Sequence, residues 1–268
     1  MKPTARVILI TLLSFAVYFT LDELFFRTVR KWIFEQTGQF GVSHNITYAL
    51  SGIPLFIGTY IIVAGTSVSE RLGLDKSPLK GFLFALICTL PLFIGFSFVF
   101  NLTSEVDPDT ILISIVAAGF FEELFFRGFL FGMLYKYTRL GFIPAVFLGA
   151  LFFGLIHLYQ STEFAELLGI FLITFLGGIL FAWTYAEWKY NLWIPIFIHM
   201  LMNLSWELFS VSDNALGDRY ANIFRFTSIG LIILLTVIYK KRRGEKLEIN
   251  KRTVWLKKSN GLAPSLQY

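Results

Sequence analysis

The segment FEELFFRG, residues 121–128, places three charged side chains inside a long apolar run. A charge near the middle of a bilayer costs about 2.5–3.5 kcal/mol on insertion scales, so such residues usually face protein and pair with one another. Glu123 and Arg127 are four residues apart on one helical face, with the acid on the N-terminal side, which predicts an ion pair. Glu122 points about 100° away from Glu123 and is left for another role.

Two of the three histidines also lie in apolar runs, each with a companion one helical turn away. His157 follows Phe153 by four residues, and His199 precedes Asn203 by four. A carboxylate, two imidazoles and a carboxamide on separate helices are the groups needed to activate a water molecule and to stabilise an oxyanion. In this interpretation Glu122 is the general base, helped by His157, while His199 and Asn203 donate to the developing negative oxygen.

The same side chains allow other interpretations. Glu122, His157 and His199 could instead hold zinc, with water in the open position, although their spacing is not that of HExxH. The charges could also form a purely structural ion cluster. A covalent nucleophile is disfavoured, because Cys88 has no acid or base near it and no Gly-x-Ser-x-Gly elbow is present. His44 falls in a predicted loop and is expected at the surface.

Long apolar runs must position these residues. The chain has 268 residues, of which 56% are hydrophobic and 15% charged, and its mean hydropathy of +0.67 exceeds that of soluble globular proteins. The runs approach the roughly 20 residues of a spanning helix, and they lack the alternation of barrel strands. The predicted fold is therefore an all-α polytopic membrane protein, with about eight transmembrane helices in one bundle. The spans are expected at about 6–26, 46–67, 81–101, 110–135, 142–160, 165–186, 191–210 and 221–240.

We expect one transmembrane domain at 1–239, with its catalytic core at about 110–210, and a basic cytoplasmic tail at 240–268. Lys and Arg gather in alternate loops and at the start of the tail, so both termini are predicted in the cytoplasm. The main exception is the basic first loop, with Arg27 and Arg30. The tail suits contact with anionic lipid, and charge that flanks membrane spans does not indicate a nucleic-acid partner.

The three motifs together resemble one family. EELFFR, from Glu122, has the pattern EExxxR; FGLIH, from Phe153, has FxxxH; and HMLMN, from His199, has HxxxN. In this order, on successive apolar helices, they resemble the CPBP family of intramembrane proteases. That family includes the CAAX prenyl endopeptidases and bacterial proteins linked to bacteriocin processing and self-immunity. The resemblance covers about residues 118–203.

The resemblance implies an eight-helix core and hydrolysis of a peptide bond in a membrane-embedded or lipidated peptide or protein. It leaves open whether the water is held by zinc or by glutamate alone. The site residues it implies are Glu122, Glu123, Arg127, His157, His199 and Asn203.

Two other functions compete with this expectation, namely a non-catalytic immunity or scaffold protein and a transporter that uses the same buried polar groups. The intact motifs favour an enzyme, and the sequence lacks the internal repeats that are typical of transporters. The expected location is the plasma membrane of a bacterium.

Overall fold

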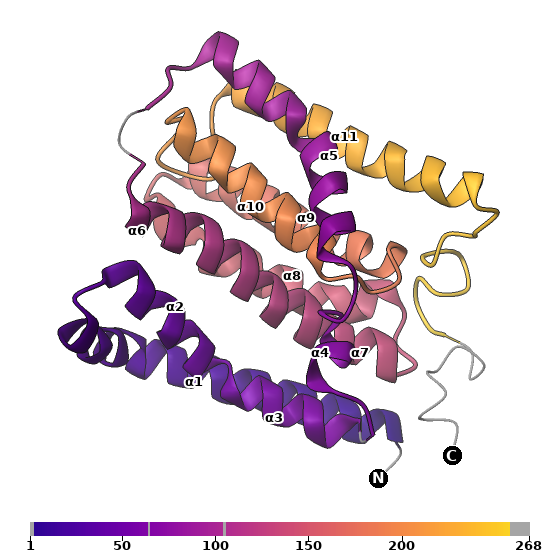
Figure 1. The fold of residues 1–268 in the computed structure, drawn as a ribbon. Coiled ribbons are helices and arrows are strands. Elements are labelled where there is room, and N and C mark those ends of the chain that lie inside the picture. Colours follow the sequence, from indigo (N-terminus) through magenta and orange to yellow (C-terminus); the bar gives the residue numbers. More distant parts are fainter. Residues whose placement is uncertain (1–2, 64, 104–105, 258–268) are drawn as a thin grey trace.

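The computed structural model describes residues 3–63, 65–103 and 106–257. These residues form helices and no strand, apart from an isolated bridge between Leu140 and Leu256. The long helices run roughly along one direction and pack into a single bundle (Figure 1). The predicted all-α polytopic fold is confirmed.

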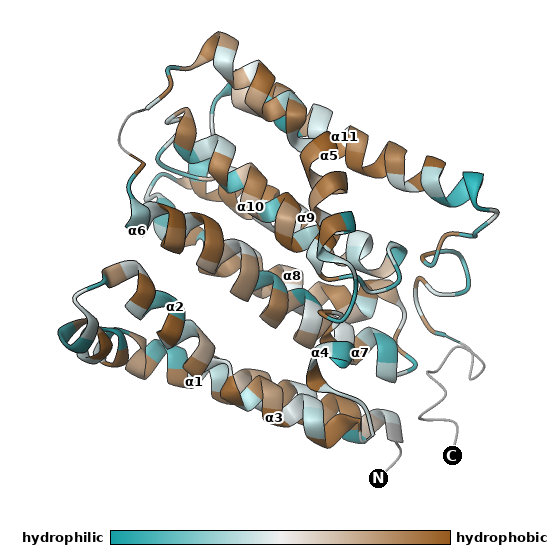
Figure 2. Ribbon diagram, viewed as in Figure 1, coloured by the Kyte–Doolittle hydropathy of each residue, from teal (hydrophilic) through white to brown (hydrophobic). Residues whose placement is uncertain are grey.

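Six helical segments are long and apolar enough to cross a membrane, in the part of the chain that the structure describes. Large apolar side chains such as Phe98 and Leu234 are exposed. Figure 2 shows that the helices carrying them, α5 (Pro78–Val99) and α11 (Arg219–Arg242), consist largely of hydrophobic residues. A lipid environment would cover these side chains. The six segments are α1 (Pro3–Thr37), α2 with α3 (Phe40–Ser51 and Ile53–Ile62), α5 (Pro78–Val99), α8 with η2 (Phe142–Ile156 and Leu158–Gln160), α9 (Phe164–Glu187) and α11 (Arg219–Arg242).

The two remaining predicted spans form the centre of the bundle. The first becomes η1 (Ile111–Phe131) followed by α7 (Gly132–Tyr137), and the second becomes α10 (Trp193–Leu208). They are not among the six segments, because η1 carries three charges and α10 has only 16 residues. α10 contacts both η1 and α5, while η1 also contacts α2, α8 and α9. Protein therefore surrounds the charged helix, which reduces the cost of its charges in a membrane.

The charged helix begins at a capped turn. The Asp107 carboxylate accepts a hydrogen bond from the Thr110 N–H at 2.7 Å, and this bond lowers the pKa of Asp107. The short helix α6 (Pro108–Thr110) then leads directly into η1. On the opposite end of the bundle, α4 (Val68–Leu72) stops at Gly73, whose φ of 85° lies in the left-handed region that favours glycine.

After α11, the chain returns to the ends of α7, α8 and α9. Three main-chain hydrogen bonds of 2.7, 2.8 and 2.9 Å join 253–255 to 141–143. Lys257 donates to the carbonyl of Tyr135, and burial lowers the pKa of Lys257 to about 8. The predicted tail boundary at residue 240 falls inside α11, and the tail packs on the bundle as far as Lys257. Its last predicted part, 258–268, lies outside the described residues.

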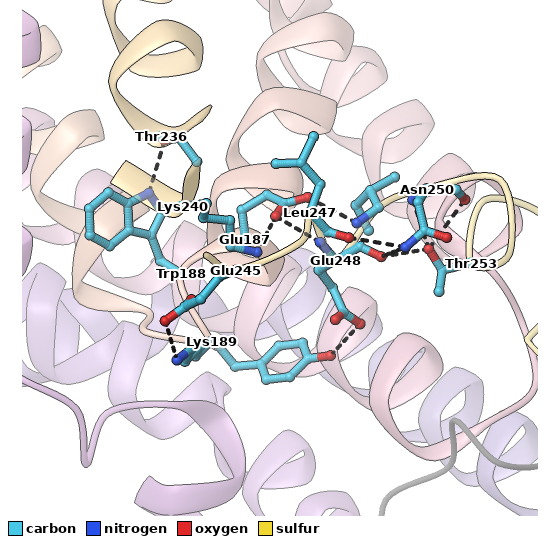
Figure 3. Close-up of polar contacts among 12 residues, drawn as sticks. Glu187, Trp188, Lys189, Thr236, Lys240, Glu245, Leu247, Glu248, Asn250 and Thr253 are labelled. Atoms are coloured by element: carbon cyan, nitrogen blue, oxygen red, sulfur yellow. Dashed lines mark hydrogen bonds and ion pairs between the residues drawn. The ribbon is translucent and has the colours of Figure 1, made fainter. Parts of the chain in front are cut away.

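Glu187, at the end of α9, anchors this returning segment (Figure 3). Its buried carboxylate accepts from Lys240 Nζ at 2.5 Å and from the main-chain N–H groups of Glu248 and Ile249 at 2.9 Å. The Glu248 side chain in turn accepts from two tyrosine hydroxyls. A charged donor and two N–H donors on one carboxylate compensate its burial.

The start of α1 and the end of α11 lie at the same end of the bundle (Figure 1), as an even number of crossings requires. The cytoplasmic placement of that end stays a prediction. The prediction that Arg27 and Arg30 lie in the first loop is wrong, because α1 continues to Thr37 and includes both residues. Helical continuation satisfies the backbone hydrogen bonds that a loop in this position would leave open.

Replacing Glu187 by alanine should lower the free energy of unfolding by about 3–5 kcal/mol, because the substitution leaves Lys240 as an uncompensated buried charge. Thermal unfolding of the purified protein in detergent would measure the loss. Glu166→Ala is a suitable control, since Glu166 is exposed and its carboxylate accepts from the Ser161 hydroxyl at 2.7 Å. Equal unfolding temperatures for the two variants would contradict the role of Glu187 as an anchor.

Candidate active site

The predicted ion pair on η1 is present and buried. Arg127 Nη1 lies 2.9 Å from Glu123 Oε1, and the two side chains are 2% and 0% exposed. η1 is a π-helix rather than the expected α-helix, and the Gly132 N–H donates to the Arg127 carbonyl five residues back. The four-residue spacing of the pair still brings the acid and the base together on one face.

His199, on α10, lies between the two glutamates. Its Nδ1 is 2.9 Å from Glu123 Oε1, and its Nε2 is 4.0 Å from Glu122 Oε2. Because a carboxylate can only accept, the His199 Nδ1 carries the proton and donates it. In the neutral tautomer with its proton on Nδ1, the Nε2 presents a lone pair toward Glu122. The angle of about 100° between neighbouring residues on a helix predicted different roles for the two glutamates. In the structure both glutamates lie beside the same imidazole ring.

His157 directly follows α8 and folds its ring back over that helix. Its Nδ1 lies 2.6 Å from the Phe153 carbonyl oxygen, which can only accept, so this Nδ1 also carries the proton. The centroid of the Phe153 ring lies 4.5 Å from that of His157 and 6.5 Å from that of His199. His157, which follows α8, and His199, on α10, are therefore both neighbours of the Phe153 ring.

Asn203 ties α10 to the charged helix. Its Nδ2 donates to the Ser114 carbonyl of η1 at 2.7 Å. A carboxamide has two N–H donors and one acceptor oxygen, so a second N–H and the oxygen remain for other partners. The predicted donation from Asn203 to an oxyanion stays a prediction.

One cavity of about 880 Å³ brings four of the six predicted site residues together. Glu122, His157, His199 and Asn203 all line it. Glu123 and Arg127 are not among its lining residues. Glu123 contacts the lining residue His199, and Arg127 contacts the lining residues Phe153 and Phe181. Much of the remaining wall is apolar and comes from α9 and α11, with side chains that include Leu172, Leu176, Leu180, Phe226 and Ile229.

The sequence-based prediction missed other residues of this cavity. His44 lies in α2 rather than in a loop, and it lines the cavity instead of the surface. Tyr48, four residues later on the same helix, lines it too. Arg225 of α11 is 6% exposed, donates to the Ala215 carbonyl at 2.7 Å and lies 4.5 Å above the ring of Trp206. Arg225 could have been found from the sequence, because it is a charged residue inside a predicted span. No spacing in the sequence indicated His44.

The described residues do not fit the zinc site that the sequence allowed. No group of three His, Cys, Asp or Glu side chains is arranged to hold a metal ion in residues 3–63, 65–103 and 106–257. Glu122, His157 and His199 share the cavity without forming such a group, and Cys88 is buried elsewhere. We therefore derive no chemical step through a metal.

Replacing Glu123 by glutamine should destabilise the protein by about 3–5 kcal/mol, because Arg127 would then be a buried charge without its counter-ion. Thermal unfolding in detergent would measure the change. Glu35→Gln is the matched control, because the pair of Glu35 and Lys31 is also spaced by four residues but is exposed, at 4.0 Å. If both variants unfold like the unmodified protein, the buried pair does not contribute to stability.

Comparisons with known proteins match the segment that contains the site. A family model described as type II CAAX prenyl endopeptidase Rce1-like matches residues 107–205. The Bacillus subtilis (strain 168) protein named “Putative membrane peptidase YdiL” is 35% identical over 99 residues, which are 36% of this chain and 35% of that protein. The alignment thus spans about a third of the relative's length. No solved structure matches the chain.

The matched segment begins at Asp107, the N-cap of α6, and ends within α10, so it holds all three motifs. Over this segment the chain is similar to the type II CAAX prenyl endopeptidase Rce1-like family, in agreement with the resemblance carried by the three motifs.

Proposed function

We propose that this chain is an intramembrane endopeptidase in which Glu122 activates a water molecule for attack on a peptide carbonyl. The observation that carries the proposal is the Glu122–His199 pair at the wall of the cavity, with Oε2 and Nε2 4.0 Å apart. The likeness to a family of membrane endopeptidases supports the same reaction.

One water molecule fits between these two acceptors. Each hydrogen bond from a water spans about 2.7–3.0 Å, so one water can donate to Glu122 Oε2 and to His199 Nε2 across the 4.0 Å separation. Both of its hydrogens are then directed at the pair, and its oxygen lone pairs face the cavity. Glu122 Oε2 is buried and has no hydrogen-bond partner in the described chain, as a site for such a water requires.

In the reaction, the water oxygen forms a bond to the peptide carbonyl carbon while Glu122 takes a proton from the water. The carbon–nitrogen bond then breaks, and the leaving nitrogen takes the proton from Glu122. The products are a carboxylic acid and an amine, so the atoms and charges balance. Glu123 keeps the His199 ring oriented throughout, because it accepts from Nδ1.

The oxyanion needs donors, and two residues of the cavity wall can supply them. Asn203 retains a second amide N–H, and His157 can donate through Nε2 once its ring is protonated. This assignment exchanges the roles that the sequence suggested for the two histidines. The reason is that His199, and not His157, is the ring beside Glu122.

The proposed substrate is a membrane-embedded or lipidated peptide or protein. The apolar walls of the cavity support this class, because Leu172 and Leu176 of α9 and Phe226 of α11 would contact an apolar chain more favourably than a hydrated one. The cavity volume of about 880 Å³ is also large enough for several side chains of a peptide.

Glu122→Gln should reduce cleavage by about 100-fold to 10,000-fold, because it keeps the side-chain shape and removes the base. The assay is cleavage of a membrane-embedded peptide library by the purified protein, read by mass spectrometry. Glu163→Gln is the control, since Glu163 is exposed at the start of α9. Cleavage by Glu122→Gln at the rate of the control would overturn the proposal.

A chelator should leave cleavage unchanged, because the described carboxylates and imidazoles do not form a three-ligand metal group. The purified protein would be assayed with and without a zinc chelator. Loss of cleavage that added zinc restores would instead place a metal at Glu122, and the water-binding step would have to be revised.

A further inference from the structure

Two aromatic rings pack against the Arg127 guanidinium, in addition to its ion pair with Glu123. Its Cζ lies 4.2 Å from the centroid of the Phe153 ring and 5.4 Å from that of Phe181. Its Nη2 is buried and has no hydrogen-bond partner among the described residues. A guanidinium between aromatic faces is stabilised by the ring quadrupoles, most strongly where water is excluded.

Phe181, on α9, contacts both side chains that donate hydrogen bonds to Glu123. Besides its contact with Arg127, its ring centroid lies 5.6 Å from that of His199. The side chain is 6% exposed and forms part of the cavity wall. Phe153 makes similar contacts but belongs to the FxxxH motif, whereas Phe181 belongs to none of the three motifs.

We propose that Phe181 is a positioning residue for the pair of Glu122 and His199. Its ring fixes Arg127 from the side of α9, Arg127 holds Glu123, and Glu123 holds Nδ1 of His199. Nε2 of the same ring is thereby directed at Glu122. The positioning role depends on the proposed function in one respect, namely that the pair of Glu122 and His199 is catalytic.

The close approach of α9 at this point supports the same role. Gly178 precedes Phe181 by three residues and so lies on the same helical face. A Cβ at Gly178 would lie 3.4 Å from Arg127 Nη2 and 3.3 Å from Ala150. Because a glycine stands there, the α9 backbone can come near enough for Phe181 to reach the guanidinium.

Phe181→Leu tests the proposal, because it keeps an apolar side chain and removes the aromatic face. Nitrogen-15 NMR of histidine-labelled protein in detergent would report the tautomer of His199. We expect the Nδ1–H form in the unmodified protein and a mixture of tautomers in Phe181→Leu. Cleavage should fall by about 10-fold or more, since a misplacement of ~1 Å can cost about 100-fold. Phe181→Tyr, which retains the ring, should restore both the signal and the rate.

Phe84→Leu is the matched control, because Phe84 is similarly buried, at 8% exposed, and packs on Trp188. It lies outside the cavity wall, so it should leave the His199 spectrum unchanged. An unmodified spectrum in Phe181→Leu, or an equal change in Phe84→Leu, would overturn the proposal. A change in Phe181→Leu together with full cleavage by Glu122→Gln would instead reject the proposed function and leave the positioning role intact.

Discussion

A carboxylate buried at the centre of a membrane bundle needs a partner, and Glu123 has two, Arg127 and His199, both at its Oε1. Removing a charge from water costs several kcal/mol, and only close, well-oriented partners return that cost. The contact between η1 and α10 follows from this requirement. Other long helices then surround these two, so the three charges of the motif lie in the middle of the protein.

Glu187 is a second buried carboxylate, and its partners differ from those of Glu123. Glu187 is compensated by Lys240 and by two main-chain N–H groups, and it fastens the C-terminal segment to the bundle. Five buried side-chain polar atoms in the described residues have no hydrogen-bond partner, and three of them belong to Glu122, Glu123 and Arg127. Since unpaired buried groups are rare, their concentration in one motif supports the proposal of a site there.

Several features were predictable because they depend on neighbours along the chain. Hydropathy over about 20 residues predicted the spanning helices, and the four-residue spacing predicted the pair of Glu123 and Arg127. The motif positions also selected Glu122, His157, His199 and Asn203, which line one cavity. What could not be predicted was which of the two imidazoles lies beside Glu122.

The sequence by itself determined the class of the protein and its candidate residues, because apolar runs and helical spacings are local properties. Only the tertiary structure decided which atoms meet. The bond between Glu123 and His199 joins residues 76 positions apart. The entry of His44 into the cavity, and of Phe181 into contact with Arg127, likewise depends on how separate helices pack. Helix packing is set by shape and charge across the whole bundle, and neither is encoded in any single stretch of the chain.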